Sequence, residues 1–235
     1  MSGRMEGEPP PEAGLLETLA AGVAHEVRNP LNSVQINLGI LEQELSELIA
    51  DQGAHVFSVL AKIASEIKRL DDFVSEFLRF TRPPRLNVQR LPLQPLLADL
   101  IAFMAPECSK RGVALELDLR GPDAAWVDAF QLKQAVLNLL LNALQAMPGG
   151  GRVVVRTGGD QRSLSIAVAD DGEGMSAETM AKAFTPFFTT REEGTGLGLP
   201  LVRRIVEQHG GSVAIASSVE QGTVVTMVFP APEGA

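Results

Sequence analysis

Two series of apolar residues, spaced alternately three and four positions apart, constrain the fold more than any other feature of the sequence. That spacing keeps apolar side chains on one face of a helix, as in helical bundles. It predicts one helix from Leu15 to about Ile49 and a second from Val56 to Phe77, and the polar stretch from Asp51 to Ala54 between them predicts an antiparallel hairpin. The first series consists of Leu16, Ala20, Val23, Val27, Leu31, Val34, Leu38, Leu41, Leu45 and Leu48, and the second of Val56, Leu60, Ile63, Ile67, Leu70, Val74 and Phe77.

A single hairpin of this kind exposes apolar surface on more than one side. Pairing with a second copy would cover that surface in a four-helix bundle, which predicts a homodimer. The alternative is that the hairpin packs against the rest of its own chain. Both arrangements account for the apolar series.

Prolines and glycines indicate where the domains begin and end. The first residues include the run Pro9 to Pro11 and bury almost nothing, so we expect them to be disordered. Pro83 and Pro84 cannot continue a helix, which predicts a domain boundary near residues 82 to 92. The expected division is a disordered N-terminus at 1–12, the helical hairpin at 13–86, a second domain at 87–231 and a disordered tail at 232–235.

The second domain alternates helix and strand patterns, which predicts an α/β architecture. Asp128, followed three residues later by Gln131, has the pattern of a helix N-cap. The predicted helices are 93–110, 131–147, 176–183 and a helix ending near residue 209, and the predicted strands are 113–119, 126–127, 152–157, 164–168, 212–217 and 222–229. We expect the turn between the third and fourth strands at residues 158–160.

His25 is the first candidate for chemistry. It stands two residues from both Val23 and Val27, roughly 200° around the helix from either, so it should point away from the apolar face. A neutral imidazole attacks electrophiles, and the adjacent Glu26 can accept or orient the proton on the other ring nitrogen. A histidine and a glutamate on an exposed helix are also an ordinary solvated pair.

Asn138 and Asn142 are the second candidates. They lie four residues apart, on one face of a helix that is otherwise almost wholly apolar. Buried amides need partners, and either neighbouring backbone groups or a ligand can supply them. Amide oxygens suit Mg²⁺, which prefers oxygen ligands and keeps several waters.

Two glycine-rich segments follow strands or precede helices. In the D-x-G-x-G segment from Asp170 to Gly174, closely spaced glycines allow a flat ligand near the backbone, and the aspartate can accept a hydrogen bond from an exocyclic amine. The same pattern also occurs in ordinary turns and in fragments of calcium loops. Farther on, the polar stretch from Glu192 to Gly196 predicts a mobile lid, and the glycines before the next helix predict a phosphate site.

In their order, these segments resemble the sensor histidine kinases of two-component systems. The phosphate-binding P-loop of other ATP sites, G-x-x-x-x-G-K-[ST], is absent from the sequence. The similarity extends from about Leu15 to Phe229. His25, Glu26, Asn29, Pro30 and Leu31 resemble the H-box of the H-E-x-x-N-P-L subgroup, Asn138 and Asn142 the N-box, Asp170, Gly172 and Gly174 the G1 box, and residues 184–199 the F and G2 boxes.

The resemblance implies a dimerisation and phosphotransfer hairpin followed by a two-layer α/β sandwich of the histidine-kinase, chaperone and gyrase type. ATP with Mg²⁺ would phosphorylate His25, and the phosphoryl group would pass to an aspartate in the receiver domain of a response regulator. Glu26 would assist the transfer, and Asn29 would orient water in a phosphatase reaction. Asn142 would hold the metal, and the nucleotide would contact Asn138, Asn142, Asp170, Gly172, Gly174, Thr190, Arg191, Gly194, Thr195, Gly196, Leu197, Gly198 and Leu199. Arg191 stands where the family often has lysine.

Composition excludes several other classes of function. A formal charge of −9 and a pI near 4.9 argue against nucleic acid or an anionic membrane as the main partner. Cys108 is the only cysteine, and no apolar run approaches the length of a membrane span, so we expect a cytoplasmic chain without membrane insertion. A sensor module is not recognisable, which indicates either a fragment of a longer sensor or a kinase that receives its signal from a separate partner.

Two other functions stay open on the sequence alone. A degenerate kinase would hold a response regulator and act as a phosphatase or scaffold. An ATPase of the wider chaperone and gyrase superfamily would share the nucleotide-binding fold but would have no use for the hairpin with His25.

Overall fold

The computed structural model describes residues 31–32, 34–41, 43, 45, 54–81, 85–160, 162–191 and 194–231. These residues belong to two compact units, one extending to residue 84 and the other beginning at Arg85. None of the helices in the described part of the chain is both long enough and apolar enough to cross a membrane.

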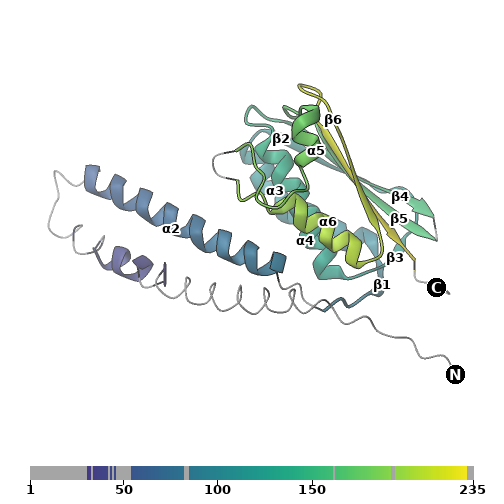
Figure 1. Cartoon of the computed structure of the whole chain (residues 1–235), viewed down its shortest axis with the longest axis horizontal. Helices are drawn as coiled ribbons and strands as arrows, with labels where there is room; N and C mark the ends of the chain where they lie inside the picture. Colours follow the sequence, from purple (N-terminus) through teal and green to yellow (C-terminus); the bar gives the residue numbers. More distant parts are fainter. Residues whose placement is uncertain are drawn as a thin grey trace. The chain divides into compact units, whose positions relative to one another are not determined.

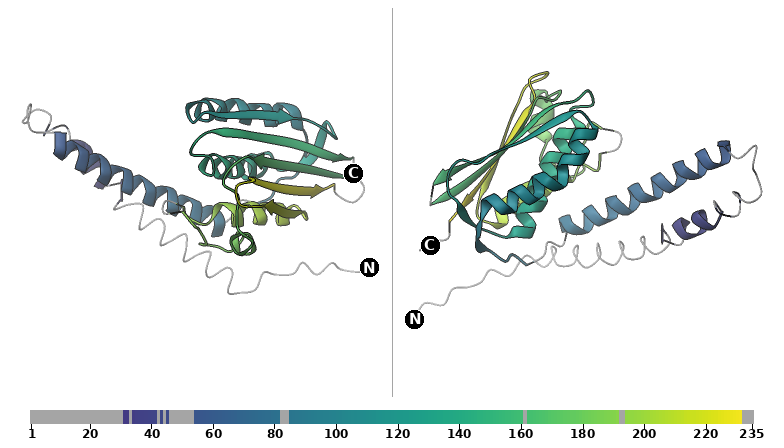
Figure 2. Two further views of the ribbon diagram at one scale, coloured as in Figure 1. Left: turned by 90° about the horizontal axis from the view of Figure 1, so that it is seen from above. Right: turned by 180° about the vertical axis from the view of Figure 1, so that it is seen from behind.

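The first unit contains the long helix α2, Ala54–Thr81, which confirms the second predicted helix and is slightly longer at both ends. Leu60, Ile67 and Val74, seven residues apart, are its buried apolar residues. Between residues 31 and 45 the described residues are helical and lie alongside α2 (Figures 1 and 2). The rest of the predicted first helix lies outside the described residues.

The second unit is built on a five-stranded mixed sheet with strand order β2-β4-β5-β7-β6. Only β2 and β4 run parallel, and the other neighbours are antiparallel. A separate antiparallel ribbon pairs β1 with β3. The strands are β1 Gln89–Pro92, β2 Val113–Asp118, β3 Ala124–Val127, β4 Gly151–Asp160, β5 Ser163–Asp170, β6 Ser212–Ser217 and β7 Thr223–Pro230.

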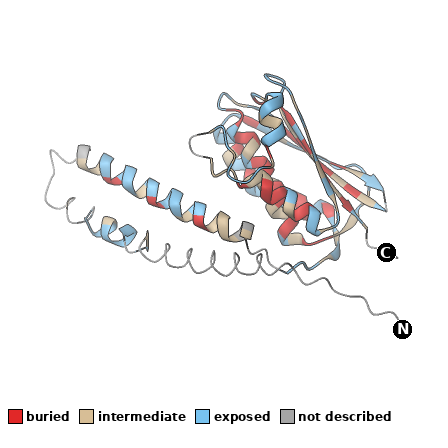
Figure 3. Cartoon of the chain, viewed as in Figure 1, coloured by how far each residue is buried: buried red, intermediate tan, exposed pale blue. Residues whose placement is uncertain are grey.

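Helices cover one face of this sheet, which gives the unit two layers (Figure 2). The helices are α3 Leu93–Lys110, α4 Ala129–Gln145, α5 Ala177–Lys182 and α6 Gly198–Gln208. Alternate residues of β5 and β7 are buried, as expected for strands with one face against a core. Figure 3 shows the buried residues concentrated on these strands and on the helices that cover them. The predicted two-layer α/β sandwich is therefore confirmed.

The predicted cap of α4 is also confirmed. The backbone N–H of Gln131 donates to the side chain of Asp128 over 3.0 Å. Ser176 caps α5 in the same way, accepting from the N–H of Thr179. Both caps satisfy N–H groups that a helix start otherwise leaves unpaired.

One strand of this unit was not predicted, and one turn was predicted at the wrong place. Residues 89–92, where the sequence predicted no strand, form β1, because Arg90 pairs with Trp126 of β3. The turn expected at 158–160 is part of β4, where Gly158 pairs with Ser165 of β5. The lack of a side chain at Gly158 allows β4 and β5 to lie close together, since a Cβ there would lie 2.8 Å from the Ser165 hydroxyl.

Candidate functional site

The predicted site residues of the first unit lie outside the described residues. His25, Glu26 and Asn29 all belong to that part of the chain, so their roles stay predictions. The other predicted residues lie in the second unit and, apart from the predicted lid residues Glu192 and Glu193, are described.

Helix α4 presents Asn138 and Asn142 from a surface that is otherwise packed in the core. Their neighbours Leu139, Leu140 and Ala143 are at most 2% exposed. The Nδ2 atom of Asn138 is buried and has no hydrogen-bond partner among the described residues. Leaving such a group unpaired costs roughly 1–3 kcal/mol, and a bound ligand would offset that cost. Rotation of the amide would present its oxygen at the same place, so this position fits an oxygen-bearing ligand or a hydrated hard cation.

Asp170 ends β5 and begins the glycine-containing loop. Its Oδ1 accepts a hydrogen bond from the N–H of Gly172 over 2.9 Å. Burial raises the pKa of Asp170 above that of an ordinary aspartate, although hydrogen bonds from backbone N–H groups and the positive charge of Arg191 act in the opposite direction. Perturbed carboxyl groups of this kind often occur in ligand sites.

The glycines of this loop allow close packing within the protein, a reason that the sequence did not predict. A Cβ on Gly172 would lie 2.7 Å from the Cβ of Ala146, just beyond the end of α4. The N–H of Glu173 donates to the carbonyl of Ala146 over 3.1 Å, which holds the loop against that helix. Gly174 has φ of 65°, and a Cβ there would overlap the carbonyl of Ser218.

Arg191 joins three segments that are distant in sequence. Its Nη1 donates to Oε1 of Gln145 over 2.9 Å, and its Nη2 lies 3.6 Å from Oε1 of Glu173. The guanidinium therefore connects the end of α4 with the Asp170 loop. Sequence reasoning gave no role to Gln145 or Glu173, although both lie within the motif segments. A contact between Arg191 and phosphates, which the resemblance implies, stays a prediction.

The segment before α6 makes hydrogen bonds within itself and with residue 187. Gly196 has φ of 67°, and its carbonyl accepts from the N–H of Phe187 over 3.0 Å. Phe187 itself has φ of 65°, a conformation that residues with a side chain rarely adopt. The N–H of Leu197 donates to the Thr195 hydroxyl over 3.2 Å.

Helix α6 begins at Gly198 without a capping side chain at Leu197, whose own side chain is fully buried. The N–H groups of Gly198 and Leu199 in the first turn can therefore serve a bound anion. Thr190 is exposed and Gly194 is half-buried. The predicted mobility of residues 192–196 stays a prediction.

The structure therefore brings together three of the predicted segments in the second unit: the asparagine-bearing helix α4, the Asp170 loop and the segment leading into α6. Helices α4 and α6 pack against each other. Among the described residues there is no group of three or more His, Cys, Asp or Glu side chains suited to a metal ion.

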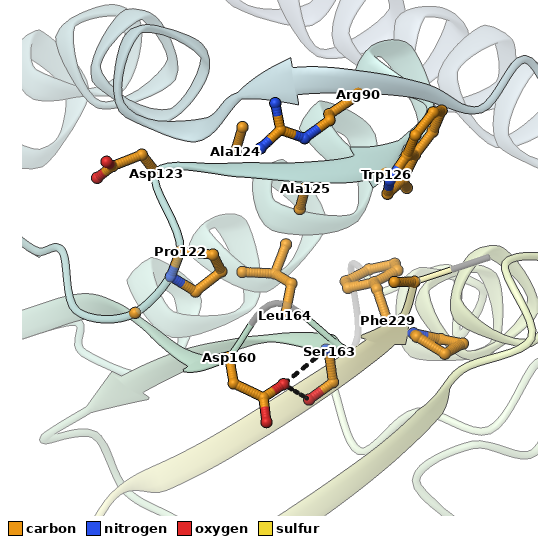
Figure 4. A pocket seen from close by; sticks show the side chains of 13 residues that line it. Arg90, Pro122, Asp123, Ala124, Ala125, Trp126, Asp160, Ser163, Leu164 and Phe229 are labelled. Atoms are coloured by element: carbon orange, nitrogen blue, oxygen red, sulfur yellow. Dashed lines mark hydrogen bonds between the residues drawn. The ribbon is translucent and has the colours of Figure 1, made fainter. Parts of the chain in front are cut away.

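A cavity of about 350 Å³ lies elsewhere, between the β1–β3 ribbon and the ends of β5 and β7 (Figure 4). Arg90 and Trp126 line it from the ribbon, and Leu164 and Phe229 line it from the sheet. It contains none of the predicted nucleotide residues. The cavity is therefore separate from the candidate site.

This fold and this arrangement define a nucleotide-binding α/β sandwich, and comparison with known families agrees. Residues 127–233 match the family of histidine kinase-, DNA gyrase B- and HSP90-like ATPases. Residues 15–85 match the His Kinase A (phospho-acceptor) domain. The chain belongs to the sensor histidine kinases of two-component systems.

Curated relatives show the same similarity. Sensor histidine kinase ZraS of Klebsiella oxytoca is 38% identical over 216 residues, which cover 90% of this chain and 45% of that protein. Sporulation kinase D of Bacillus subtilis is 35% identical over 218 residues, covering 92% of this chain and 42% of that protein. The chain thus spans less than half the length of these relatives.

Solved structures share the fold. Full-length ShkA in complex with AMPPNP superposes with a TM-score of 0.76 at 24% identity, over 91% of this chain and 46% of that one. Histidine kinase ThkA in complex with the response regulator protein TrrA superposes with a TM-score of 0.68 at 25% identity, over 95% of this chain and 64% of that one.

Proposed function

We propose that the chain binds ATP in its second unit, transfers the γ-phosphoryl group to His25 and passes it to an aspartate of a response regulator. The observation that carries the proposal is the succession of two family matches in one chain. The phospho-acceptor match at 15–85 contains His25, and the ATPase match at 127–233 contains Asn138, Asn142 and Asp170. Neither match alone provides both the acceptor and the nucleotide site.

The adenine end of the nucleotide would lie at Asp170. Its carboxylate accepts hydrogen bonds, so it would bind the exocyclic amine of adenine and reject guanine, which has an acceptor at that position. Gly172 allows the loop to lie close to the end of α4 at Ala146, and Gly174 allows it to lie close to Ser218, which positions the segment that follows the carboxylate. The partly buried position of Asp170 strengthens such a bond.

The phosphate end would lie between α4 and the start of α6. The buried amide nitrogen of Asn138, unpaired among the described residues, and the neighbouring Asn142 supply polar groups on α4. Mg²⁺, when bound through Asn142, would neutralise charge on the phosphates. Backbone N–H groups from Gly196 to Leu199 would contact the phosphates from the other side, with Thr190, Arg191, Gly194 and Thr195 nearby in sequence.

At the acceptor, a ring nitrogen of His25 would attack the γ-phosphorus. The new P–N bond forms as the bond to the bridging β,γ-oxygen breaks, so ADP leaves and the proton on the other ring nitrogen passes toward Glu26. The reaction needs mainly positioning and charge neutralisation.

The response regulator is the proposed partner, which is consistent with the complex of ThkA with TrrA. In an opposing reaction, Asn29 would orient water against the phosphoaspartate of the regulator; the bond from phosphorus to the aspartyl oxygen would break and inorganic phosphate would leave, giving a phosphatase activity. Glu26→Gln should then lower His25 labelling by roughly 10²-fold while regulator dephosphorylation stays largely intact, and Asn29→Ala should do the opposite. Parallel loss of both activities in both variants, measured with far-UV circular dichroism as a control for helicity, would contradict this division.

A homodimer is part of the proposal. Ile63 and Leu70 belong to the apolar series of α2, yet they are 42% and 43% exposed in the single chain. A second hairpin would cover them in a four-helix bundle. We further propose a phosphotransfer hairpin at 13–86 and an ATP-binding domain at 87–231, with input from a longer sensor or a separate partner. A cytoplasmic location stays a prediction.

Incubation with γ-labelled ATP and Mg²⁺ tests the proposed function. Label that is labile in acid and stable in base identifies phosphohistidine, and its transfer to an added receiver domain completes the reaction. Absence of label under all conditions, with a receiver domain still bound, would favour the regulator-binding scaffold. ATP hydrolysis without a labelled protein would favour an ATPase of the chaperone and gyrase type.

A further inference from the structure

Asp128 makes two different contacts with its two carboxylate oxygens. Its Oδ1 accepts from the N–H of Gln131 over 3.0 Å, which caps α4. Its Oδ2 accepts from the N–H of Asn87 over 2.9 Å. The residue is only 7% exposed, so water competes little for either bond. Asp128 therefore holds residue 87 to the first turn of the helix that carries the asparagines.

His209 makes a second connection at the same place. The backbone N–H of Asp128 donates to Nε2 of His209 over 3.0 Å. The other ring nitrogen, Nδ1, lies 2.8 Å from the carbonyl of Ile205 and donates to it. Since Nε2 must accept and Nδ1 must donate, these contacts fit the tautomer with its proton on Nδ1. The ring also meets the edge of Phe229, with centroids 5.3 Å apart.

These contacts join three parts of the nucleotide-binding unit. Helix α4 carries Asn138 and Asn142, and α6 begins at Gly198 and has His209 as its C-cap. Asn87 lies in the short irregular segment, residues 85–88, that opens the second unit a few residues after the end of α2 at Thr81. The two helices are thus tied together at Asp128, and the same residue holds the chain that arrives from the hairpin.

We propose that Asp128 and His209 are positioning residues for phosphoryl transfer, which hold the segment following the hairpin to both helices of the nucleotide site. This inference rests on the proposed function and adds to it the place in the second unit, Asn87, at which the chain that follows the hairpin is held to α4. Neither side chain contacts the predicted nucleotide residues. Loss of the attachment should therefore slow transfer to His25 and leave ATP affinity unchanged, because geometry between the reacting groups governs the rate of transfer.

Asp128→Ser separates the capping role from the attachment. Serine caps helices as well as aspartate does, but its single oxygen cannot also accept from Asn87. In the full-length chain at saturating ATP, we expect the rate of His25 labelling to fall about three- to tenfold, the effect of one lost hydrogen bond. The Kd for a fluorescent ATP analogue should match the wild type, and the thermal unfolding midpoint should fall only slightly, by the loss of one hydrogen bond. Asp128→Ala, which also loses the cap, should lower the midpoint further.

His209 offers a matched pair of variants. Glutamine places its Oε1 where Nε2 stands and can accept from Asp128, whereas asparagine places its amide nitrogen where Nδ1 stands and keeps only the bond to Ile205. His209→Gln should label at close to the wild-type rate, and His209→Asn should show the same three- to tenfold fall. Hydrogen exchange at the Asp128 amide gives an independent readout: protection should persist in His209→Gln and disappear in His209→Asn.

Unchanged labelling in both Asp128→Ser and His209→Asn would overturn the positioning role while leaving the proposed function intact. A fall in ATP affinity equal to the fall in rate would overturn it as well, because the residues would then support the nucleotide site alone. A wild-type chain that takes no label would overturn the proposed function itself, and the role in transfer with it. Gln208→Ala, an exposed substitution beside His209, serves as the neutral control.

Discussion

The two units of the chain bury their apolar residues to different degrees. In α4 of the second unit, Leu132, Val136 and Leu140 are at most 1% exposed. In α2 of the first unit, the best-buried residues are Leu60, Ile67 and Val74, at 4%, 7% and 8%, and Leu70 on a neighbouring strip is 43% exposed. The second unit thus closes its core within one chain, whereas the hairpin has an apolar surface wider than one chain covers.

This difference parallels the proposed division of labour. The unit with a complete core holds the residues assigned to the nucleotide, and the unit with an incomplete one contains His25, the proposed acceptor. A self-contained core can bind a ligand as a separate domain, while an apolar surface left exposed is suited to association with another copy. The predictions below test whether the two units are independent in this sense, from the largest expected effect to the smallest.

The largest effect should come from His25→Gln. We expect complete loss of phosphohistidine label, because glutamine has no nucleophilic ring nitrogen, with ATP affinity unchanged. His55→Gln, which alters another of the three histidines, is the matched control and should label normally. Label that persists in His25→Gln, located by peptide mapping, would place the acceptor elsewhere and remove the functional contrast between the units.

Asp170→Asn tests the self-sufficiency of the second unit. A fragment of residues 85–235 should fold and bind ATP with an affinity close to that of the full chain. Asp170→Asn in that fragment should weaken binding by about 10- to 100-fold, the effect of losing a hydrogen bond to a charged acceptor. Calorimetric titration measures both. The exposed neighbour Asp171→Asn should bind normally, and a fragment that fails to bind ATP would contradict the independence of the unit.

Two substitutions in α2 test the incomplete core of the hairpin. Leu70→Lys should weaken the dimer by roughly 1.5–3 kcal/mol, the contribution of burying one leucine, yet leave the helix intact. Ile67→Lys should reduce helicity as well, because that side chain is 7% exposed within one chain. Light scattering across micromolar concentrations and circular dichroism separate the two outcomes, with the exposed Lys68→Gln as control. A wild type that is monomeric throughout would refute the dimer.

The smallest effect concerns pH. In the proposed site, adenine would bind the ionised carboxylate of Asp170, and burial raises the pKa of that group. Affinity for ATP should therefore fall by a few-fold on acidification, beginning at a higher pH than for an ordinary aspartate. Since the folded-state pKa lies above the unfolded one, ionisation of Asp170 disfavours the folded state, and this penalty is relieved as pH falls through the folded pKa.

Titrations of wild type and Asp170→Asn across the same pH range isolate this dependence, because protonation of ATP itself affects both proteins alike. The variant should lack the additional fall in affinity. It should also be no less stable than the wild type at neutral pH. An identical pH profile in the two proteins would show that the carboxylate does not contact the base.

Much of the fold follows from local sequence patterns. The spacing of apolar residues predicted a helix at 93–110, and the structure has α3 at Leu93–Lys110. The strand β1 was missed because Gln89, Arg90 and Pro92 have no apolar alternation, and only pairing with β3 makes the segment a strand. The turn at 158–160 was misplaced because Gly-Gly-Asp is ordinary turn chemistry, and the register with β5 overrides it.

The sequence by itself determined the helical periods, the caps at Asp128 and Ser176, and the order of the segments assigned to histidine, nucleotide and phosphate. Those properties depend on residues within one or two turns of each other. Only the tertiary structure decided that Arg191 binds Gln145 and Glu173, and that His209 accepts from the backbone of Asp128. Arg191 and Gln145 are 46 residues apart in the sequence, and His209 and Asp128 are 81 residues apart. Such pairs meet because the sheet and its helices pack in one arrangement, and no local period encodes which distant atoms that packing brings within hydrogen-bonding distance.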